Sequence, residues 1–203
     1  MTVAASTNAD SINWVSYVIS VGVGLLLGVI TEPLRLWLLR PRLTATFTSD
    51  EHCLRETPVV GVGNAQLHSV AKVARFLVRN ERRFSAKNSR AYLTQIDRRN
   101  ADGSFTTIFA DRLPLTWAYI GANAVDIPGK SQLYCDVAGA SQIQPSLKPY
   151  TEPGAQLFNE IFDEHAVYRF TAIVTADNVL PIKIQILINW QGNWNFVDVR
   201  QEE

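Results

Sequence analysis

This chain is poor in the residues that build covalent frameworks and metal centres, with two cysteines and three histidines among 203 residues. Cys53 and Cys135 form at most one pair, which excludes the disulfide framework of small secreted domains, and a reducing compartment would leave both thiols free. His52, His68 and His165 lie far apart, and only His52 has a cysteine beside it. No spacing of the zinc-binding kind completes that pair. We therefore predict no metal and no cofactor.

Catalytic motifs are also missing. The Gly61–Gly63 stretch lacks the third glycine and the strand-to-helix setting of a nucleotide-binding loop, and no nucleophile elbow occurs. Asp97 with Asp111, and the neighbours Asp163–Glu164, are the carboxylate pairs that would suit acid–base chemistry. Surface carboxylates are common in any β domain, so these pairs alone do not indicate a hydrolase.

Charge is absent from Ile12 to Ile30, a run of 19 residues. As a helix this run covers about 28 Å, close to the hydrocarbon thickness of a bilayer. Trp14 and Tyr17 lie at one end and Trp37 lies beyond the other, as in the aromatic belts of membrane helices. The run is too long for a signal-peptide core and no basic residue precedes it. We predict an uncleaved transmembrane helix over residues 12–31.

Positive charges flank only the downstream end of this run. Arg35, Arg40 and Arg42 follow it, whereas residues 1–11 contain no lysine or arginine. Because basic flanks stay in the cytoplasm, we predict a single-pass protein of the inner (plasma) membrane. Residues 1–11 form a short non-cytoplasmic tail, and the C-terminal domain is cytoplasmic. The juxtamembrane segment 32–42 is either a short helix that begins at Pro33 or the end of one long helix.

Small residues recur every four positions along the predicted membrane helix. This spacing lets two helix backbones approach closely, although glycine and serine are common in such helices anyway. The prediction is helix–helix packing and self-association through Ser16, Ser20, Gly24 and Gly28.

Residues 43–203 are long enough for one domain with its own core. Apolar residues alternate with polar ones more often than they show helical spacing. About eight strands are expected, at 43–49, 73–79, 91–96, 104–109, 132–137, 168–175, 182–190 and 193–199. The fold class is therefore mainly β, with one N-terminal transmembrane helix followed by an antiparallel sandwich.

Two sequence patterns predict buried faces and a turn in that domain. Alternation places Ala74, Phe76 and Val78 on one face, and the alternate isoleucines from Ile184 to Ile188 on another. Residues 190–194 read as a tight hairpin in which Gly192 supplies a positive φ. Segment 141–166 breaks the strand pattern, and its residues 156–165 are expected to form a short helix.

A resemblance follows from two stretches. Phe76–Asn80, then Ser85–Leu93, resembles the pattern of strand, asparagine, turn, Ala-x-Asn and strand found in immunoglobulin-like modules of uncharacterised bacterial proteins. The segment 32–42 is similar to the juxtamembrane stretch of single-pass proteins of that kind. The resemblance implies an immunoglobulin-like β-sandwich and an anchor, and implies no activity. The Cys…Trp…Cys pattern of antibody domains is not present.

Basic residues concentrate in one part of a chain whose total charge is zero. Residues 72–99 hold nine lysines and arginines against Glu81 and Asp97. Such a patch suits anionic lipid or an acidic protein partner, or it serves as a solvated edge that resists aggregation. Stacking aromatics do not interleave with it, which argues against nucleic acid. The residues predicted to dock lipid or a partner are Arg35, Arg40, Arg42, Arg79, Arg82, Arg83, Lys87 and Arg90.

These patterns predict a membrane-anchored, non-catalytic module for protein interaction or assembly that faces the cytoplasm. Its expected partners are the lipid bilayer and a protein, or a second copy of the chain. One alternative is an enzyme or ligand sensor with its site in loops 51–68 and 141–166, because long loops carry function. Another is a membrane-acting effector that oligomerises through its anchor.

Overall fold

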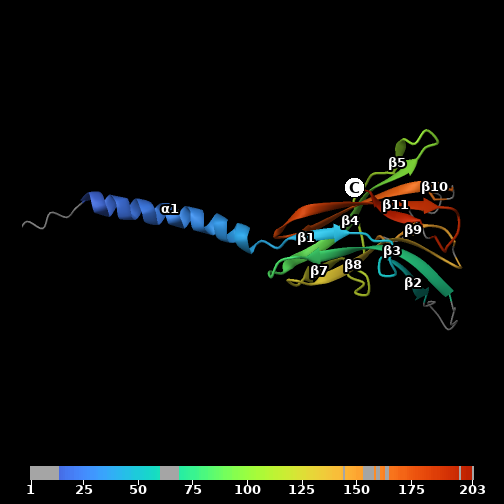
Figure 1. Cartoon of the computed structure of the whole chain (residues 1–203), viewed down its shortest axis with the longest axis horizontal. Coiled ribbons are helices and arrows are strands. Elements are labelled where there is room, and N and C mark those ends of the chain that lie inside the picture. Colours follow the sequence, from blue (N-terminus) through green and yellow to red (C-terminus); the bar gives the residue numbers. More distant parts are fainter. Residues whose placement is uncertain are drawn as a thin grey trace, which may run out of the picture. The chain divides into compact units, whose positions relative to one another are not determined.

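The computed structural model describes residues 14–59, 69–143, 145–152, 158, 161, 162, 165–196 and 198–202. Of these, the side chains of residues 14–17, 26, 27, 29, 32, 33, 35–37 and 59 are outside the description. The chain divides into two units, Met1–Arg40 and Pro41–Glu203. The first unit contains the helix and the second contains all the strands drawn in Figure 1.

The first unit contains one continuous helix, α1, from Trp14 to Leu39. The alternative of a short helix beginning at Pro33 is therefore wrong, and the long helix is confirmed. Large apolar side chains are exposed along α1 at Val18, Ile19, Val21, Val23, Leu25, Ile30, Leu34, Leu38 and Leu39. Among the described residues, no helix meets the length and apolarity required of a membrane span.

The second unit is mainly β and consists of two antiparallel sheets. In the first sheet the strand order is β1-β3-β8-β9, and β2 also pairs with β3. The bounds of these strands are β1 Leu43–Thr46, β2 Leu54–Val59, β3 Ser69–Asn80, β8 Gln132–Ser141 and β9 Lys148–Pro149. We call this sheet A.

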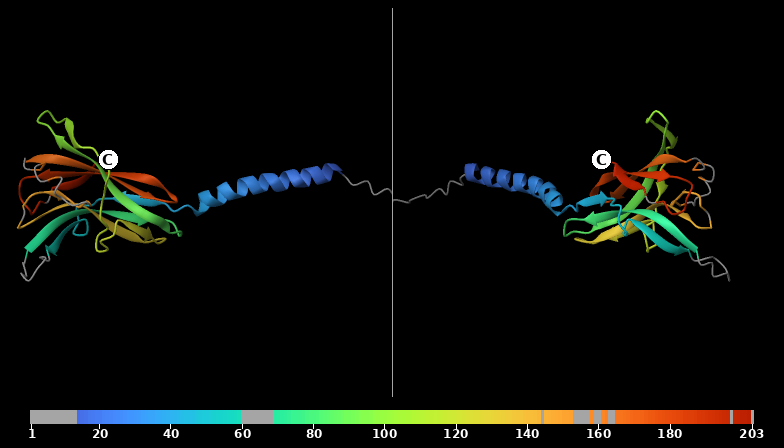
Figure 2. Two further views of the ribbon diagram at one scale, coloured as in Figure 1. Left: turned by 180° about the vertical axis from the view of Figure 1, so that it is seen from behind. Right: turned by 45° about the vertical axis from the view of Figure 1, so that its right-hand side comes forward.

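The second sheet, sheet B, has the order β12-β11-β10-β4-β5, with β6 and β7 also paired to β4. Its strands are β4 Ala86–Arg99, β5 Phe105–Phe109, β6 Leu113–Pro114, β7 Ala124–Ile127, β10 Ala166–Ala176, β11 Val179–Trp190 and β12 Val199–Glu202. Figures 1 and 2 show β3 and β8 in one layer and β10 and β11 in the other. This arrangement is consistent with a β-sandwich.

An apolar core of described residues lies between the sheets. Alternate residues of β3 and β11 contribute to it, as the period-two pattern predicted: Ala74, Phe76, Val78, Ile184, Ile186 and Ile188 are all buried. Strand side chains point alternately to opposite faces, so β3 and β11 each direct one face toward this core. Cys53 and Cys135 are buried in it and unpaired.

The chain crosses from sheet A to sheet B between β3 and β4, and Asn80 organises the crossing. This fully buried side chain donates from Nδ2 to the carbonyl oxygens of Phe84, Ile127 and Pro128. The β7–β8 turn, which packs against this crossing, needs Gly129, because a Cβ there would lie 1.9 Å from the Arg83 carbonyl oxygen. Both turns at this end of the domain are therefore held together by one amide.

The predicted strand at 193–199 is wrong, and so is the tight hairpin at 190–194. The last strand, β12, begins at Val199, and residues 191–198 connect it to β11. Gly192 does adopt the predicted positive φ, at 70°. Phe196 folds back onto Trp190 with ring centroids 6.0 Å apart, and this packing replaces strand pairing. The predicted helix at 156–165 lies largely outside the described residues.

Candidate interaction surface

An ordered turn follows the segment that joins the two sheets. β6 pairs with β4 of sheet B, and the next residues pair with β8 of sheet A, where the Ala118 N–H donates to the Tyr134 carbonyl at 2.8 Å. The Trp117 carbonyl then accepts the N–H groups of Ile120 and Gly121, both at 3.2 Å. Trp117 is buried, so the residue whose carbonyl accepts both hydrogen bonds is held in the core.

The tip of this turn exposes two large apolar side chains. Tyr119 is 70% exposed and Ile120 is 49% exposed. Tyr119 has a φ of 66°, a left-handed conformation that bulky residues rarely adopt. Such strain, on the order of 1–3 kcal/mol, persists where the surrounding structure fixes it, and it is concentrated at functional sites.

Two arginines of sheet A hold the Tyr119 ring. Arg75 Nη1 donates to the Tyr119 hydroxyl at 2.6 Å, and its guanidinium carbon lies 5.1 Å from the ring centroid. The guanidinium carbon of Arg55, on β2, lies 5.5 Å from the same centroid. An aromatic ring beside two cations gains cation–π stabilisation and loses rotational freedom. Arg75 and Arg55 thus hold the Tyr119 ring in place, while most of this side chain stays exposed to solvent.

Arg75 is itself buried, and its charge is balanced by Asp136 of β8. The two strands place them opposite each other, with Arg75 Nε 3.0 Å from Asp136 Oδ1. Neither atom makes a well-directed hydrogen bond in the described structure. Burial raises the pKa of the Asp136 carboxyl to about 6, and this effect outweighs the lowering by the nearby Arg75 charge. Burial likewise raises the pKa of Tyr150, and the Asp136 charge adds to this increase.

The raised pKa of Asp136 predicts that stability falls as the pH rises. The folded state holds this proton up to a pH of about 6, whereas an unfolded aspartate releases it near 3.8. The stabilisation of the folded state by this proton is therefore fully present below the unfolded pKa of Asp136. It is lost as the pH rises through the folded pKa. Its size is roughly 3 kcal/mol, at about 1.4 kcal/mol for each pKa unit.

The measurement compares urea unfolding of the unmodified chain and of Asp136→Asn between a pH of about 4 and a pH of about 7. Only the difference between the two chains matters, because their other titrating groups are the same. A carboxyl resonance of Asp136 that titrates near its ordinary value would contradict the prediction.

An open groove borders this surface on the β2 side. Its volume is about 640 Å³, and its described lining residues lie in the first predicted loop, 51–68, except for Lys72 of β3. Its walls carry charges of both signs, and Lys72 Nζ already donates to Asn195 Oδ1 at 2.7 Å. The lining residues are Glu51, His52, Leu54, Arg55, Glu56 and Lys72. Residues 60–68 of the predicted loop lie outside the described part.

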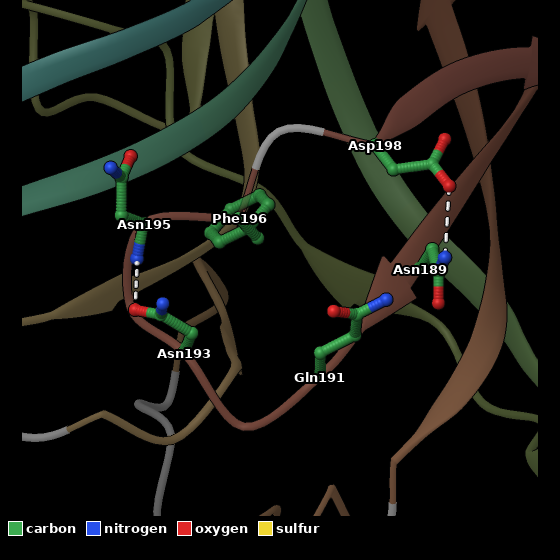
Figure 3. A pocket seen from close by; sticks show the side chains of 6 residues that line it. All are labelled: Asn189, Gln191, Asn193, Asn195, Phe196 and Asp198. Carbon is green, nitrogen blue, oxygen red and sulfur yellow. Dashed lines mark hydrogen bonds between the residues drawn. The ribbon is translucent and has the colours of Figure 1, made fainter.

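A smaller pocket of about 140 Å³ lies in the connection between β11 and β12 (Figure 3). Amide side chains dominate its lining, and three of them are hydrogen-bonded: Asn189 Nδ2 donates to Asp198 at 2.8 Å, Asn193 Oδ1 accepts the Asn195 N–H at 3.0 Å, and Asn195 Oδ1 accepts the bond from Lys72. Figure 3 shows the Gln191 side chain next to Asn189, and the Phe196 ring between Asn195 and Asp198 in this view. None of these groups is a nucleophile paired with a base.

Asp97, one of the carboxylates considered for acid–base chemistry, has a structural role. Asp97 is buried, and it accepts hydrogen bonds from Gln95, Thr107 and Arg169. Burial alone would raise its pKa, but these hydrogen bonds and the Arg169 charge outweigh burial, so the pKa lies below the ordinary value. Asp163–Glu164 and His68 lie outside the described residues. Within the described ranges no group of His, Cys, Asp and Glu side chains has the arrangement of a metal site.

The residues predicted to dock a partner fall into two groups. Ser20, Gly24 and Gly28 lie exposed on α1, and a Cβ added at either glycine would meet nothing within 4 Å. The side chains of Ser16 and Arg35 lie outside the description. Arg40 follows α1, and the other five basic residues of the predicted patch lie on β3, β4 and their connection: Arg79, Arg82, Arg83, Lys87 and Arg90. Arg42 is the second residue of the second unit and pairs with Glu81 at 3.6 Å.

Sequence reasoning missed Tyr119, Arg75 and Asp136. Arg75 and Asp136 are far apart in the chain, and only the β3–β8 register brings them together. A local signal was available for the turn: residues 117–121 read Trp-Ala-Tyr-Ile-Gly, a stretch without strand alternation that ends in a glycine.

Comparison with protein families, curated proteins and solved structures finds no match to this chain. The resemblance to immunoglobulin-like bacterial proteins therefore stays a prediction.

Proposed function

We propose that this protein is a membrane-tethered, non-catalytic module that binds another protein through its Tyr119–Ile120 turn. The observation that carries the proposal is this turn, where an exposed tyrosine is held in a strained conformation over Arg75 and beside Arg55. Tyrosine and arginine dominate the binding energy of protein interfaces. A ring that is already immobile loses little entropy on binding, so its contacts contribute more fully to affinity.

The membrane tether is the second part of the proposal. Large apolar side chains at Val18, Ile19, Val21, Val23 and Leu25 are exposed along α1. Lipid suits such a surface better than water does. The basic residues after α1 favour a cytoplasmic position for the β domain at the inner membrane. Retention of the chain in the membrane pellet after a carbonate wash tests this part.

The immunoglobulin-like assignment belongs to the same proposal. It is supported by the passage of the chain from β3 in one sheet to β4 in the other, and by a core shared between the sheets. Modules of this architecture present loops and strand faces for recognition.

The rival function is a ligand sensor at the groove beside β2. The groove is large enough for a small molecule, but Leu54 is the one apolar residue in its lining among the described residues. Ligand pockets are mostly apolar with a few convergent polar groups. The Tyr119–Ile120 turn, by contrast, has the composition of a protein-binding site, and we therefore favour protein binding.

Site-specific photo-crosslinking in native cells tests the binding turn. A photoreactive residue in place of Ile120 is expected to give discrete protein adducts, and the same residue at exposed Ala101 is the matched control. Adding Tyr119→Ser should abolish the adducts, because loss of such a residue costs at least about 2 kcal/mol of binding free energy. Equal labelling at both positions, or none at Ile120, would exclude the turn as the binding site.

A further inference from the structure

Backbone contacts gather several turns at the end of the β domain where the chain enters it. The Glu81 N–H donates to the Arg42 carbonyl at 2.8 Å, and the Lys130 N–H donates to the Arg82 carbonyl at 2.8 Å. The start of the domain, the β3–β4 connection and the β7–β8 turn are therefore neighbours.

The β10–β11 turn joins the same end. The Asp177 N–H donates to the Lys87 carbonyl at 3.0 Å, and Asn178 Nδ2 donates to the Ser85 carbonyl at 3.1 Å. We call this end the entry pole and define it as residue Arg42 with the segments 79–90, 126–131 and 176–180.

The entry pole is basic. In the described part of the chain it carries seven lysines and arginines against three acidic residues. Arg42 pairs with Glu81 and Lys87 pairs with Asp126, but these pairs are exposed and leave the excess of positive charge in place. The basic residues are Arg42, Arg79, Arg82, Arg83, Lys87, Arg90 and Lys130, and the acidic ones are Glu81, Asp126 and Asp177.

Two large apolar side chains stand among these cations. Phe84 is 44% exposed and Leu180 is 66% exposed. Their backbones are fixed, because Asn80 Nδ2 donates to the Phe84 carbonyl at 2.7 Å and Asn178 joins the turn before Leu180 to Ser85. Apolar side chains ringed by lysine and arginine are typical of surfaces that enter the boundary between lipid headgroups and acyl chains.

We propose that the entry pole docks on an anionic bilayer, with Phe84 and Leu180 in the headgroup boundary and Arg82, Arg83 and Lys130 on lipid phosphates. This inference rests on the proposed membrane tether, which it deepens by assigning the contact surface. Two observations favour lipid over other occupants. The charge is complementary to an anionic leaflet. In the chain only Arg40 and Pro41 separate α1 from Arg42, so a tether in the membrane would keep the pole at high effective concentration near lipid.

The test uses the full-length chain in vesicles of phosphatidylcholine, with or without phosphatidylglycerol. An environment-sensitive fluorophore is attached at Leu180→Cys, with Ala101→Cys as the control position. Cys53 and Cys135 are buried and remain unlabelled under native conditions. We expect a blue shift at position 180 with phosphatidylglycerol only, no shift at position 101, and reversal at about 1 M salt, where the screening length is about 3 Å.

Two sets of variants separate the charges from the apolar contacts. Arg82→Gln, Arg83→Gln and Lys130→Gln together should lower the docked-to-undocked ratio by roughly a hundredfold, at about fivefold for each charge. Phe84→Ser should reduce the blue shift, whereas Ile143→Ser, which removes an apolar residue of similar exposure outside the pole, should leave it unchanged.

The outcomes distinguish the docking surface from the tether. A chain that resists carbonate washing but shows no shift at position 180 overturns docking and leaves the tether intact. A chain that washes off overturns the tether, and the emission at position 180 before the wash still decides docking. A shift that is equal in neutral vesicles, or that appears with an acidic protein instead of lipid, overturns the assignment to anionic lipid.

Discussion

Replacing Asn80 with alanine should destabilise the β domain by about 3–5 kcal/mol, because buried carbonyl groups that lose their donor each cost about 1–3 kcal/mol. The amide nitrogen of Asn80 lies 2.7, 3.1 and 3.2 Å from the carbonyl oxygens of Phe84, Ile127 and Pro128. Its two N–H groups serve three acceptors, and its own carbonyl accepts the Arg82 N–H at 3.2 Å. The measurement is urea unfolding of the full chain in detergent micelles, followed by circular dichroism of the strands.

Two further variants test the cause of this loss. Asn80→Asp keeps the size of the side chain but cannot donate when ionised, so it should be at least as damaging as alanine. Asn193→Ala removes an exposed asparagine that caps only the Asn195 N–H, and it should cost less than about 1 kcal/mol. Equal losses at positions 80 and 193 would show that the buried network contributes little.

The period-two pattern predicted the long strands because one face of each is buried. Phe76 on β3 and Ile186 on β11 are flanked two positions away by other core residues, and a register slip would expose all of them. The period-two pattern could not predict β6 and β9, because strands of two residues are too short to show an alternation. β2 was missed because it contains charges and Pro58, which are typical of an edge strand and not of a core strand.

The last loop shows how an alternating pattern misleads. Trp194 and Phe196 are spaced like strand residues, but Phe196 packs on Trp190 of the preceding strand. Tertiary packing of an aromatic ring overrides strand propensity here. The sequence alone could not distinguish the two outcomes, since both bury Phe196.

The surface around Tyr119 could not be predicted from the sequence, for a different reason. Arg75 reads as one more member of the basic stretch 72–99, although it is almost fully buried and supports Tyr119. A charged side chain in a strand is normally solvated. The burial of Arg75 can therefore be inferred only once the β3–β8 pairing is known to place Asp136 beside it. In contrast, the basic residues of the entry pole were predictable as a cluster because most of them are neighbours in the chain.

Replacing Trp117 with alanine should cost about 3–5 kcal/mol through the cavity left in the core, because the surrounding structure relaxes only in part. The backbone of Trp117 bridges to Cys135 in sheet A, and its indole Nε1 donates to the Ser89 carbonyl in sheet B at 3.2 Å. This residue therefore ties the two sheets together, and both should lose protection in hydrogen exchange when it is removed.

Graded substitutions separate the volume of Trp117 from its hydrogen bond. Trp117→Phe keeps an aromatic ring but removes the donor and part of the indole volume, so its loss of stability should fall short of that of alanine, with about 1–2 kcal/mol of it from the unpaired Ser89 carbonyl. Trp194→Ala is the matched control, because that tryptophan is only partly buried and packs at the edge of the core. If alanine at position 117 cost no more than alanine at position 194, the sheets would be held by the rest of the core and not by this crossing. Because Ile120 and Gly121 both donate to the Trp117 carbonyl, loss of the indole should also loosen the Tyr119–Ile120 turn and lower crosslinking from Ile120 in the same variant.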